Sequence, residues 1–261
     1  MVQAVDPTVL AVVVATVLAG AGGFFVPVLI GRIPPHVVLE TTEEPTPAGS
    51  EVDGTVDAIS TVVPAEPPEP FPDIARLPGL GWKSALAAAI AGAIVGVAVG
   101  WTWALVLWIP LVPVSVALAV VDWWTRLLPT AVIRPTYGLL VALVLLGWAV
   151  TGDTDDVVRA ALGWLVAGGL YGLLWLIYPR GLGFGDVRLA GVLGIALGWV
   201  GWGSVTVGVY AGFLLGGVLG GLLSVLRIVE RKGFPFGPFM LLGAVVGLLW
   251  GEPLWSGLVS G

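Results

Sequence analysis

The sequence predicts an all-α polytopic membrane protein with about eight transmembrane helices, and three observations lead to this fold class. Of 261 residues, 57% are hydrophobic and only 11% are charged, which is unlike an ordinary soluble domain. Long apolar runs recur; the first, Thr8–Ile30, is long enough to span a bilayer of about 30 Å at about 1.5 Å per residue. When these runs alternate in direction, every Lys and Arg except Arg159 falls on one side, which predicts a cytoplasmic side there and an N-terminus outside.

The composition also excludes several functional classes. The chain has no cysteine and a single histidine, His36, so thiol nucleophiles, cysteine-bound zinc and Ser-His triads have almost no residues to use. Its net charge is −6, and it has no cluster of basic residues that would bind phosphates, which makes nucleic acid an unlikely partner. We therefore expect no cofactor, no metal and no nucleic acid.

Three regions are predicted: a first transmembrane helix at 1–31, an acidic cytoplasmic loop at 32–83 and a seven-helix core at 84–261. Residues 31–82 hold nine of the 17 acidic residues and only two basic ones, and they are rich in proline. Such a segment buries too little apolar surface to offset its ordering entropy, so the loop is predicted to be disordered. Two interpretations stay open, a variable solvated loop and a docking tail for a basic partner.

The remaining apolar runs define the other spans. They predict two spans within 84–121 that turn near residues 100–103, and further spans at about 136–150, 160–178, 187–202 and 204–226, with a last span ending near residue 250. Pro129 disfavours a continuous helix between the third and fourth spans. Glycines four residues apart, such as Gly194 with Gly198 and Gly217 with Gly221, predict close packing between helices.

Two aspartates stand out because the predicted topology puts both at the cytoplasmic border. Asp122 ends the third span, and Asp186 follows a glycine-rich turn and opens the sixth. Two carboxylates held close in a low dielectric share a proton, so one can activate a water while the other polarises a peptide carbonyl. This is the logic of an aspartyl protease. The alternative is that each aspartate caps a helix or pairs with Arg126 or Arg188.

Three stretches resemble motifs of the prepilin peptidase family, the GxGD-type aspartyl proteases of the bacterial inner membrane. Gly183-Phe-Gly-Asp186 with Val187-Arg188-Leu189 resembles the second active-site motif, with Arg188 where Lys is usual. Val121-Asp122, followed by Leu127-Leu128-Pro129, resembles the first motif, with Thr130 in place of the usual Asp or Asn. The stretch Phe234-Pro-Phe-Gly-Pro-Phe239 resembles the family's loop before the last span.

The resemblance implies a short-form aspartic endopeptidase with Asp122 and Asp186 as its catalytic residues. It implies cleavage of leader peptides from type IV prepilins or pseudopilins at the cytoplasmic face of the inner membrane. Membrane lipid and components of pilus or secretion assemblies would be further partners. The residues expected to contact substrate are Gly183, Gly185, Arg188, Phe234, Pro235 and Gly237. For Arg188, the plainer interpretation is a basic side chain that snorkels to the membrane interface.

The chain departs from the family pattern after Arg32-Ile-Pro34. The family's cysteine-bearing cytoplasmic domain would follow there, and this chain has His36 and the acidic loop instead. We therefore expect no zinc, and the departure puts the family's N-methyltransferase activity in doubt.

Two other classes of function compete with the peptidase. One is a transporter or membrane assembly scaffold in which the aspartates bind a cation or are structural, although both fall at span ends rather than at mid-membrane. The other is a membrane-anchored interaction protein that uses the acidic loop; deletion of residues 36–80 would abolish its function and spare a peptidase.

Overall fold

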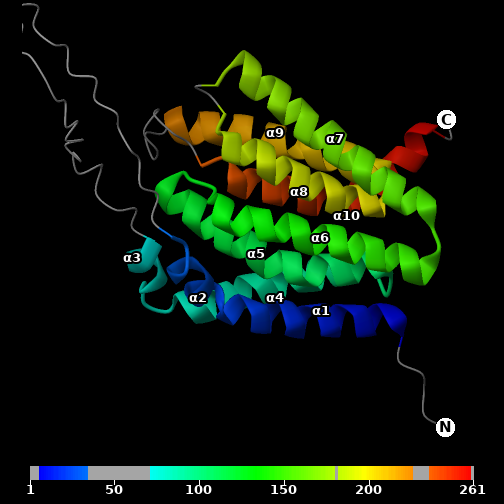
Figure 1. Cartoon of the computed structure of the whole chain (residues 1–261), viewed down its shortest axis with the longest axis horizontal. Coiled ribbons are helices and arrows are strands. Elements are labelled where there is room, and N and C mark those ends of the chain that lie inside the picture. Colours follow the sequence, from blue (N-terminus) through cyan, green and yellow to red (C-terminus); the bar gives the residue numbers. More distant parts are fainter. Residues whose placement is uncertain (1–5, 35–70, 180–181, 226–234, 260–261) are drawn as a thin grey trace, which may run out of the picture.

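The computed structural model describes residues 6–34, 71–179, 182–225 and 235–259, and in these segments the chain is helical without strands. Figure 1 shows the long helices lying side by side as one bundle. In chain order the helices are α1 (Pro7–Phe24), α2 (Val26–Gly31), α3 (Phe71–Ala75), α4 (Leu80–Val99), α5 (Trp103–Thr125), α6 (Thr130–Thr151), α7 (Thr154–Ile177), α8 (Phe184–Val200), α9 (Trp202–Val225) and α10 (Gly237–Val259).

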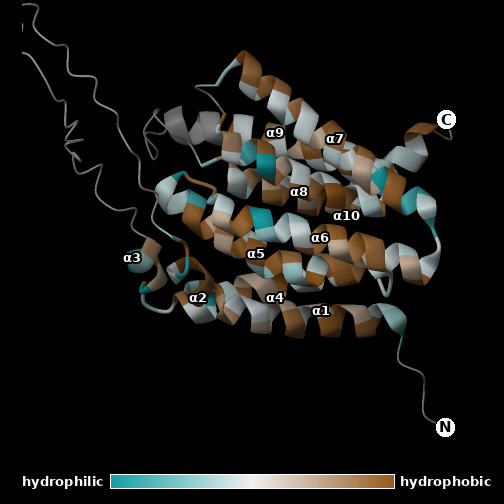
Figure 2. Ribbon diagram, viewed as in Figure 1, coloured by the Kyte–Doolittle hydropathy of each residue, from teal (hydrophilic) through white to brown (hydrophobic). Residues whose placement is uncertain are grey.

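Six of the described helices are long and apolar enough to cross a membrane, namely α1, α4, α5, α6, α7 and α10. Apolar residues, brown in Figure 2, predominate along these helices, and many large ones are exposed on the outside of the bundle. The all-α polytopic prediction is therefore confirmed, and the chain is a multi-pass membrane protein. α8 is shorter, at 17 residues. The count of eight spans and the placement of the N-terminus outside stay predictions.

The first predicted span, Thr8–Ile30, is divided into α1 and α2 at Phe25. Pro27 lies in the first turn of α2 and has no N–H to donate to the preceding turn, so the helix restarts there. The predicted turn near residues 100–103 is confirmed: α4 ends at Val99, and Gly100 caps it with φ of 61°, a conformation that favours glycine.

Several predicted boundaries were wrong. The acidic loop was expected to run as far as residue 83, but α3 occupies part of it and α4 begins at Leu80. Phe71 and Ile74 of α3 are buried, because they are the apolar residues that this end of the loop can place against the bundle. Residues 35–70 of that loop lie outside the described residues. α6 begins at Thr130, six residues before the expected start, directly after Pro129.

α8 is the central helix of the bundle. It contacts α5, α6, α7, α9 and α10 and is buried along nearly its whole length. A helix that is apolar all round and rich in glycine suits this position, because its neighbours can approach from every side. Gly194 and Gly198 of α8 lie against the backbone of α7, as predicted from their spacing, whereas a Cβ on Gly217 would meet nothing within 4 Å.

The two aspartates lie at one end of this bundle. α5 ends and α8 begins there, together with the starts of α4, α6 and α10 (left in Figure 1). The shared depth of Asp122 and Asp186 thus follows from helices that run in alternating directions.

Candidate active site

Asp122 lies in the last turn of α5 and is only 3% exposed. Its Oδ2 accepts a hydrogen bond of 2.9 Å from the backbone N–H of Gly237, 115 residues further along the chain. Gly237 is the first residue of α10, where backbone N–H groups have no partner within the helix. The start of α10 therefore satisfies and orients the carboxylate of α5.

Asp186 is the third residue of α8 and is 8% exposed. Its Oδ2 accepts a hydrogen bond of 2.9 Å from the N–H of Gly183, the residue that precedes the helix. Asp186 therefore caps α8, as the helix-cap interpretation expected, and the positive end of the helix dipole faces its charge. Capping uses one of its two carboxylate oxygens.

Leu128 lies against the two glycines that adjoin the aspartates, Gly185 and Gly237. A Cβ on Gly185 would lie 2.8 Å from Cβ of Leu128, and a Cβ on Gly237 would lie 3.4 Å from its Cδ2 and 2.9 Å from Oδ2 of Asp122. The absence of side chains at these glycines lets the α5–α6 connection lie against both α8 and α10. The carboxylate of Asp122 is also within electrostatic range of Asp186. The structure thus brings together the two residues that the sequence singled out.

An aromatic cluster lies beside Asp186. The rings of Tyr171 and Phe213 have their centroids 4.6 Å apart, and Phe236, next to Gly237, lies 6.1 Å from Tyr171 and 5.8 Å from Phe213. Tyr171 is almost fully buried and within electrostatic range of Asp186. This cluster packs α7, α9 and the start of α10 around the site and excludes water from that side.

Arg188 is held by its own chain. Its guanidinium donates to the hydroxyl of Thr130 and lies 4.7 Å from the ring centroid of Phe184, a cation–π contact. Its backbone carbonyl accepts a hydrogen bond of 2.7 Å from the hydroxyl of Tyr137. These contacts of Arg188 are with Thr130, Phe184 and Tyr137. The sequence had suggested an ion pair between Arg188 and an aspartate, and these contacts do not include one.

The other predicted site residues are partly accounted for. Gly183, Gly185 and Gly237 adjoin the aspartates, Pro235 is buried two residues before Gly237, and Phe234 lies outside the described residues. Their contact with a substrate stays a prediction. Sequence reasoning missed Thr130, Leu128 and Tyr171 as parts of the site. Leu128 and Thr130 lay within the first motif, but nothing in the sequence pointed to Tyr171. In the described part of the chain, no group of three His, Cys, Asp or Glu side chains could hold a metal ion.

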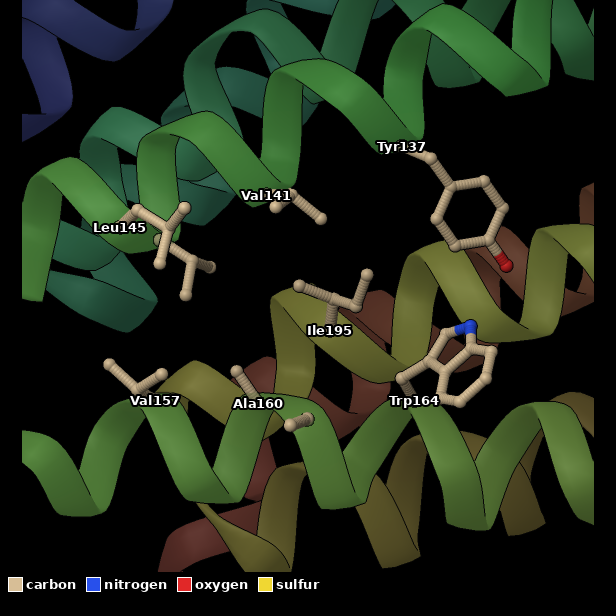
Figure 3. Close-up of a pocket in the computed structure, with 9 residues that line it drawn as sticks. Tyr137, Val141, Leu145, Val157, Ala160, Trp164 and Ile195 are labelled. Atoms are coloured by element: carbon tan, nitrogen blue, oxygen red, sulfur yellow. The ribbon is translucent and has the colours of Figure 1, made fainter.

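An apolar groove lies further along the bundle, between its middle and the end away from the aspartates. Its cavity volume is about 610 Å³ and it lies between α6, α7 and α8. Figure 3 shows Val141 and Leu145 of α6 facing Val157 and Ala160 of α7 across Ile195 of α8. Tyr137 and Trp164 lie at one end, over Gly191, whose missing side chain leaves room for both rings.

The pair of carboxylates can perform acid–base chemistry without a cofactor. Both are buried, each is oriented by a backbone N–H, and they come from two helices that the bundle holds in place. In general, two carboxyl groups held close in a low dielectric share a proton, an arrangement that supplies one general base and one general acid. The cap on Asp186 does not conflict with this role, because a second oxygen remains for chemistry.

Comparison with known proteins finds matches to one group of membrane peptidases. The family model described as the type IV leader peptidase family matches residues 109–225, which include both aspartates. Proteins named prepilin leader peptidase/N-methyltransferase are similar to the chain. One from Aeromonas salmonicida (strain A449) is 33% identical over 144 residues, which is 54% of this chain and 48% of that protein. One from Pseudomonas putida is 31% identical over 176 residues, 63% of this chain and 58% of that protein.

A third relative, from Escherichia coli (strain K12), is 32% identical over 144 residues, 50% of this chain and 57% of that protein. The chain thus spans about half the length of the curated relatives it matches. No solved structure matches it. Residues 109–225, which carry both aspartates and the glycine-rich turn, are thus similar to the type IV leader peptidase family.

Proposed function

We propose that the chain is a membrane aspartyl endopeptidase that removes leader peptides from type IV prepilin-like or pseudopilin proteins. The observation that carries this proposal is the pair Asp122 and Asp186, both buried at one end of the bundle and each oriented by a backbone N–H. Relatives named prepilin leader peptidase support the substrate class. The reaction would occur at the cytoplasmic face of the inner membrane, with the N-terminus outside and residues 32–83 as a cytoplasmic segment.

The proposed reaction is hydrolysis of one peptide bond by a shared-proton pair. The ionised aspartate takes a proton from water, and the oxygen of that water forms a bond to the scissile carbonyl carbon. The protonated aspartate donates to the carbonyl oxygen, where negative charge develops. The tetrahedral intermediate collapses as its C–N bond breaks, and the leaving nitrogen receives a proton from the pair. No group outside the chain, water and substrate is needed for this balance.

The groove between α6, α7 and α8 would hold the apolar helix of the substrate. Along α8, Gly191 and Ile195 lie five and nine residues beyond Asp186, which is about 8 to 14 Å at about 1.5 Å per residue. A helix that starts at the scissile bond and runs parallel to α8 would therefore place its fifth to ninth residues in the groove.

The proposal is tested by incubating the chain in membranes with a prepilin-type substrate and mapping the cut by mass spectrometry. We expect one cut before the apolar helix with the wild type and none with Asp122→Asn/Asp186→Asn. Equal cleavage by that double variant would contradict the proposal. If the wild type instead moves a cation across vesicles and does not cut, the transporter alternative is correct.

A further inference from the structure

We propose that Thr130 and Arg188 act together as a positioning clamp that sets the separation of Asp122 and Asp186. The proposal deepens the proposed function, on which it rests, and it assigns Arg188 a role other than the substrate contact expected from the sequence. Neither side chain touches reacting atoms in this account. Both act through the loop that carries Leu128.

In the clamp, two hydrogen bonds join α6 to α8. The guanidinium of Arg188 donates to the hydroxyl of Thr130, the first residue of α6, across 58 positions of sequence. The carbonyl of Arg188 accepts from Tyr137, two turns further along α6, at 2.7 Å. The ring of Phe184 lies under the guanidinium and restricts its orientation. A planar, always charged guanidinium suits such a fixed bridge better than a flexible ammonium.

The position of Thr130 bears directly on the aspartates. Thr130 follows Leu128 by two residues, and Leu128 lies against Gly185 on α8 and Gly237 on α10. Gly237 supplies the N–H that orients Asp122, and Gly185 adjoins Asp186. If the clamp opens, Leu128 can move away from Gly185 and Gly237, and the spacing of the two carboxylates is no longer fixed. A misplacement of about 1 Å at a reacting centre can cost about 10²-fold in rate.

A clamp and a substrate contact predict different kinetics. A residue that contacts substrate acts without Thr130, so Arg188→Gln would raise KM while Thr130→Val would have little effect. A clamp makes the two residues equivalent, since either change breaks the same hydrogen bond. It also affects the reacting geometry rather than binding, so kcat falls while KM stays near its wild-type value.

The first test is a double-mutant cycle on prepilin cleavage with Thr130→Val, Arg188→Gln and the double variant. We expect each single change to lower kcat by about 10- to 100-fold with KM within about twofold, and the double variant to be no worse than the poorer single. Thr130→Asp/Arg188→Lys, which restores a charged donor–acceptor pair, should recover most of kcat. Arg134→Gln, an exposed basic residue of α6, is the control and should behave as wild type. Losses that multiply, or a rise in KM confined to Arg188→Gln, would overturn the clamp.

A second measurement does not depend on activity. The chain has no cysteine, so spin labels can be placed at Leu127→Cys and Tyr178→Cys, exposed positions in the α5–α6 connection and at the end of α7. α7 packs tightly on α8, so this distance reports on the loop relative to α8. We expect Thr130→Val and Arg188→Gln to broaden the distance distribution and Arg134→Gln to leave it unchanged. An unchanged distribution in the first two variants would refute the clamp, whereas a wild type that cuts no substrate would refute only the proposed function.

Discussion

Thr130 and Arg188 are the two positions at which the active-site motifs of this chain depart from the pattern they resemble, and their side chains are hydrogen-bonded to each other. Both departures therefore fall on one contact, in which a threonine hydroxyl accepts from an arginine guanidinium, whose geometry a lysine does not reproduce. This pairing was not visible in the sequence, where the residues stand 58 positions apart. The pairing becomes apparent only in the fold, where the first turns of α6 and α8 lie together.

Gly237→Ala tests whether the position of the Asp122 carboxylate matters for activity, because it adds a single carbon atom beside it. The added Cβ would lie 2.9 Å from Oδ2 of Asp122 and 3.4 Å from Cδ2 of Leu128, so the carboxylate must move. We expect kcat for prepilin cleavage to fall by about 10-fold or more. The matched control is Gly257→Ala in the same helix, where a Cβ meets nothing within 4 Å, and it should retain full activity. Wild-type turnover by Gly237→Ala would show that the position of Asp122 is not critical.

At the level of the helices, most of the fold could be predicted from the sequence, because an apolar run long enough to span a bilayer has few alternatives. The two aspartates could be placed at one depth by counting helices of alternating direction. Contacts that depend on shape could not be predicted. Leu128 reads as an ordinary apolar residue, and Tyr171 lies within an apolar span. The break at Phe25 was missed because Pro27 is compatible with either a kink or a restart.

The packing of α7 on α8 depends on the absence of side chains at their contact. A Cβ on Gly194 would clash with the carbonyl oxygen of Gly163, within the backbone of α7. Overpacking costs about 1–3 kcal/mol and helix propensity returns about 1 kcal/mol, so we expect Gly194→Ala to lower the free energy of unfolding by up to about 2 kcal/mol. Thermal unfolding in detergent measures the difference. Gly169→Ala, on α7 with open space at its Cβ, should be neutral or slightly stabilising, and an equal result for both would refute the packing argument.

If the groove between α6, α7 and α8 binds the substrate helix, filling it should weaken substrate binding. Ala161 lines the groove, and Ala161→Phe would fill part of its volume of about 610 Å³. Because the groove is proposed to bind the substrate helix and not the scissile bond, we expect KM to rise about 10-fold or more with kcat nearly unchanged. Leu165→Phe, on the exposed surface of the same helix, serves as the control. If both variants have the wild-type KM, the substrate helix binds elsewhere.

For the whole molecule, the placement of the site at the cytoplasmic face is tested by labelling with a membrane-impermeant thiol reagent. Asp155→Cys lies at the far end of the bundle from the aspartates, and Arg76→Cys lies at the near end, both on exposed side chains. Each would be the only cysteine of its variant. In spheroplasts, we expect Asp155→Cys to react at once and Arg76→Cys to react only after permeabilisation. The opposite pattern would place the active site outside.

The central claim is that Asp122 and Asp186 form one catalytic unit, and the most direct measurement is prepilin cleavage by the two single Asn variants and their combination in membranes. Residues that act as a unit are non-additive, because losing either one removes the whole function. We predict that Asp122→Asn and Asp186→Asn each lower kcat/KM by at least about 10³-fold while remaining folded, and that the combined variant is no worse than either. Near-normal cleavage by a single variant, or losses that multiply in the combined one, would contradict the account.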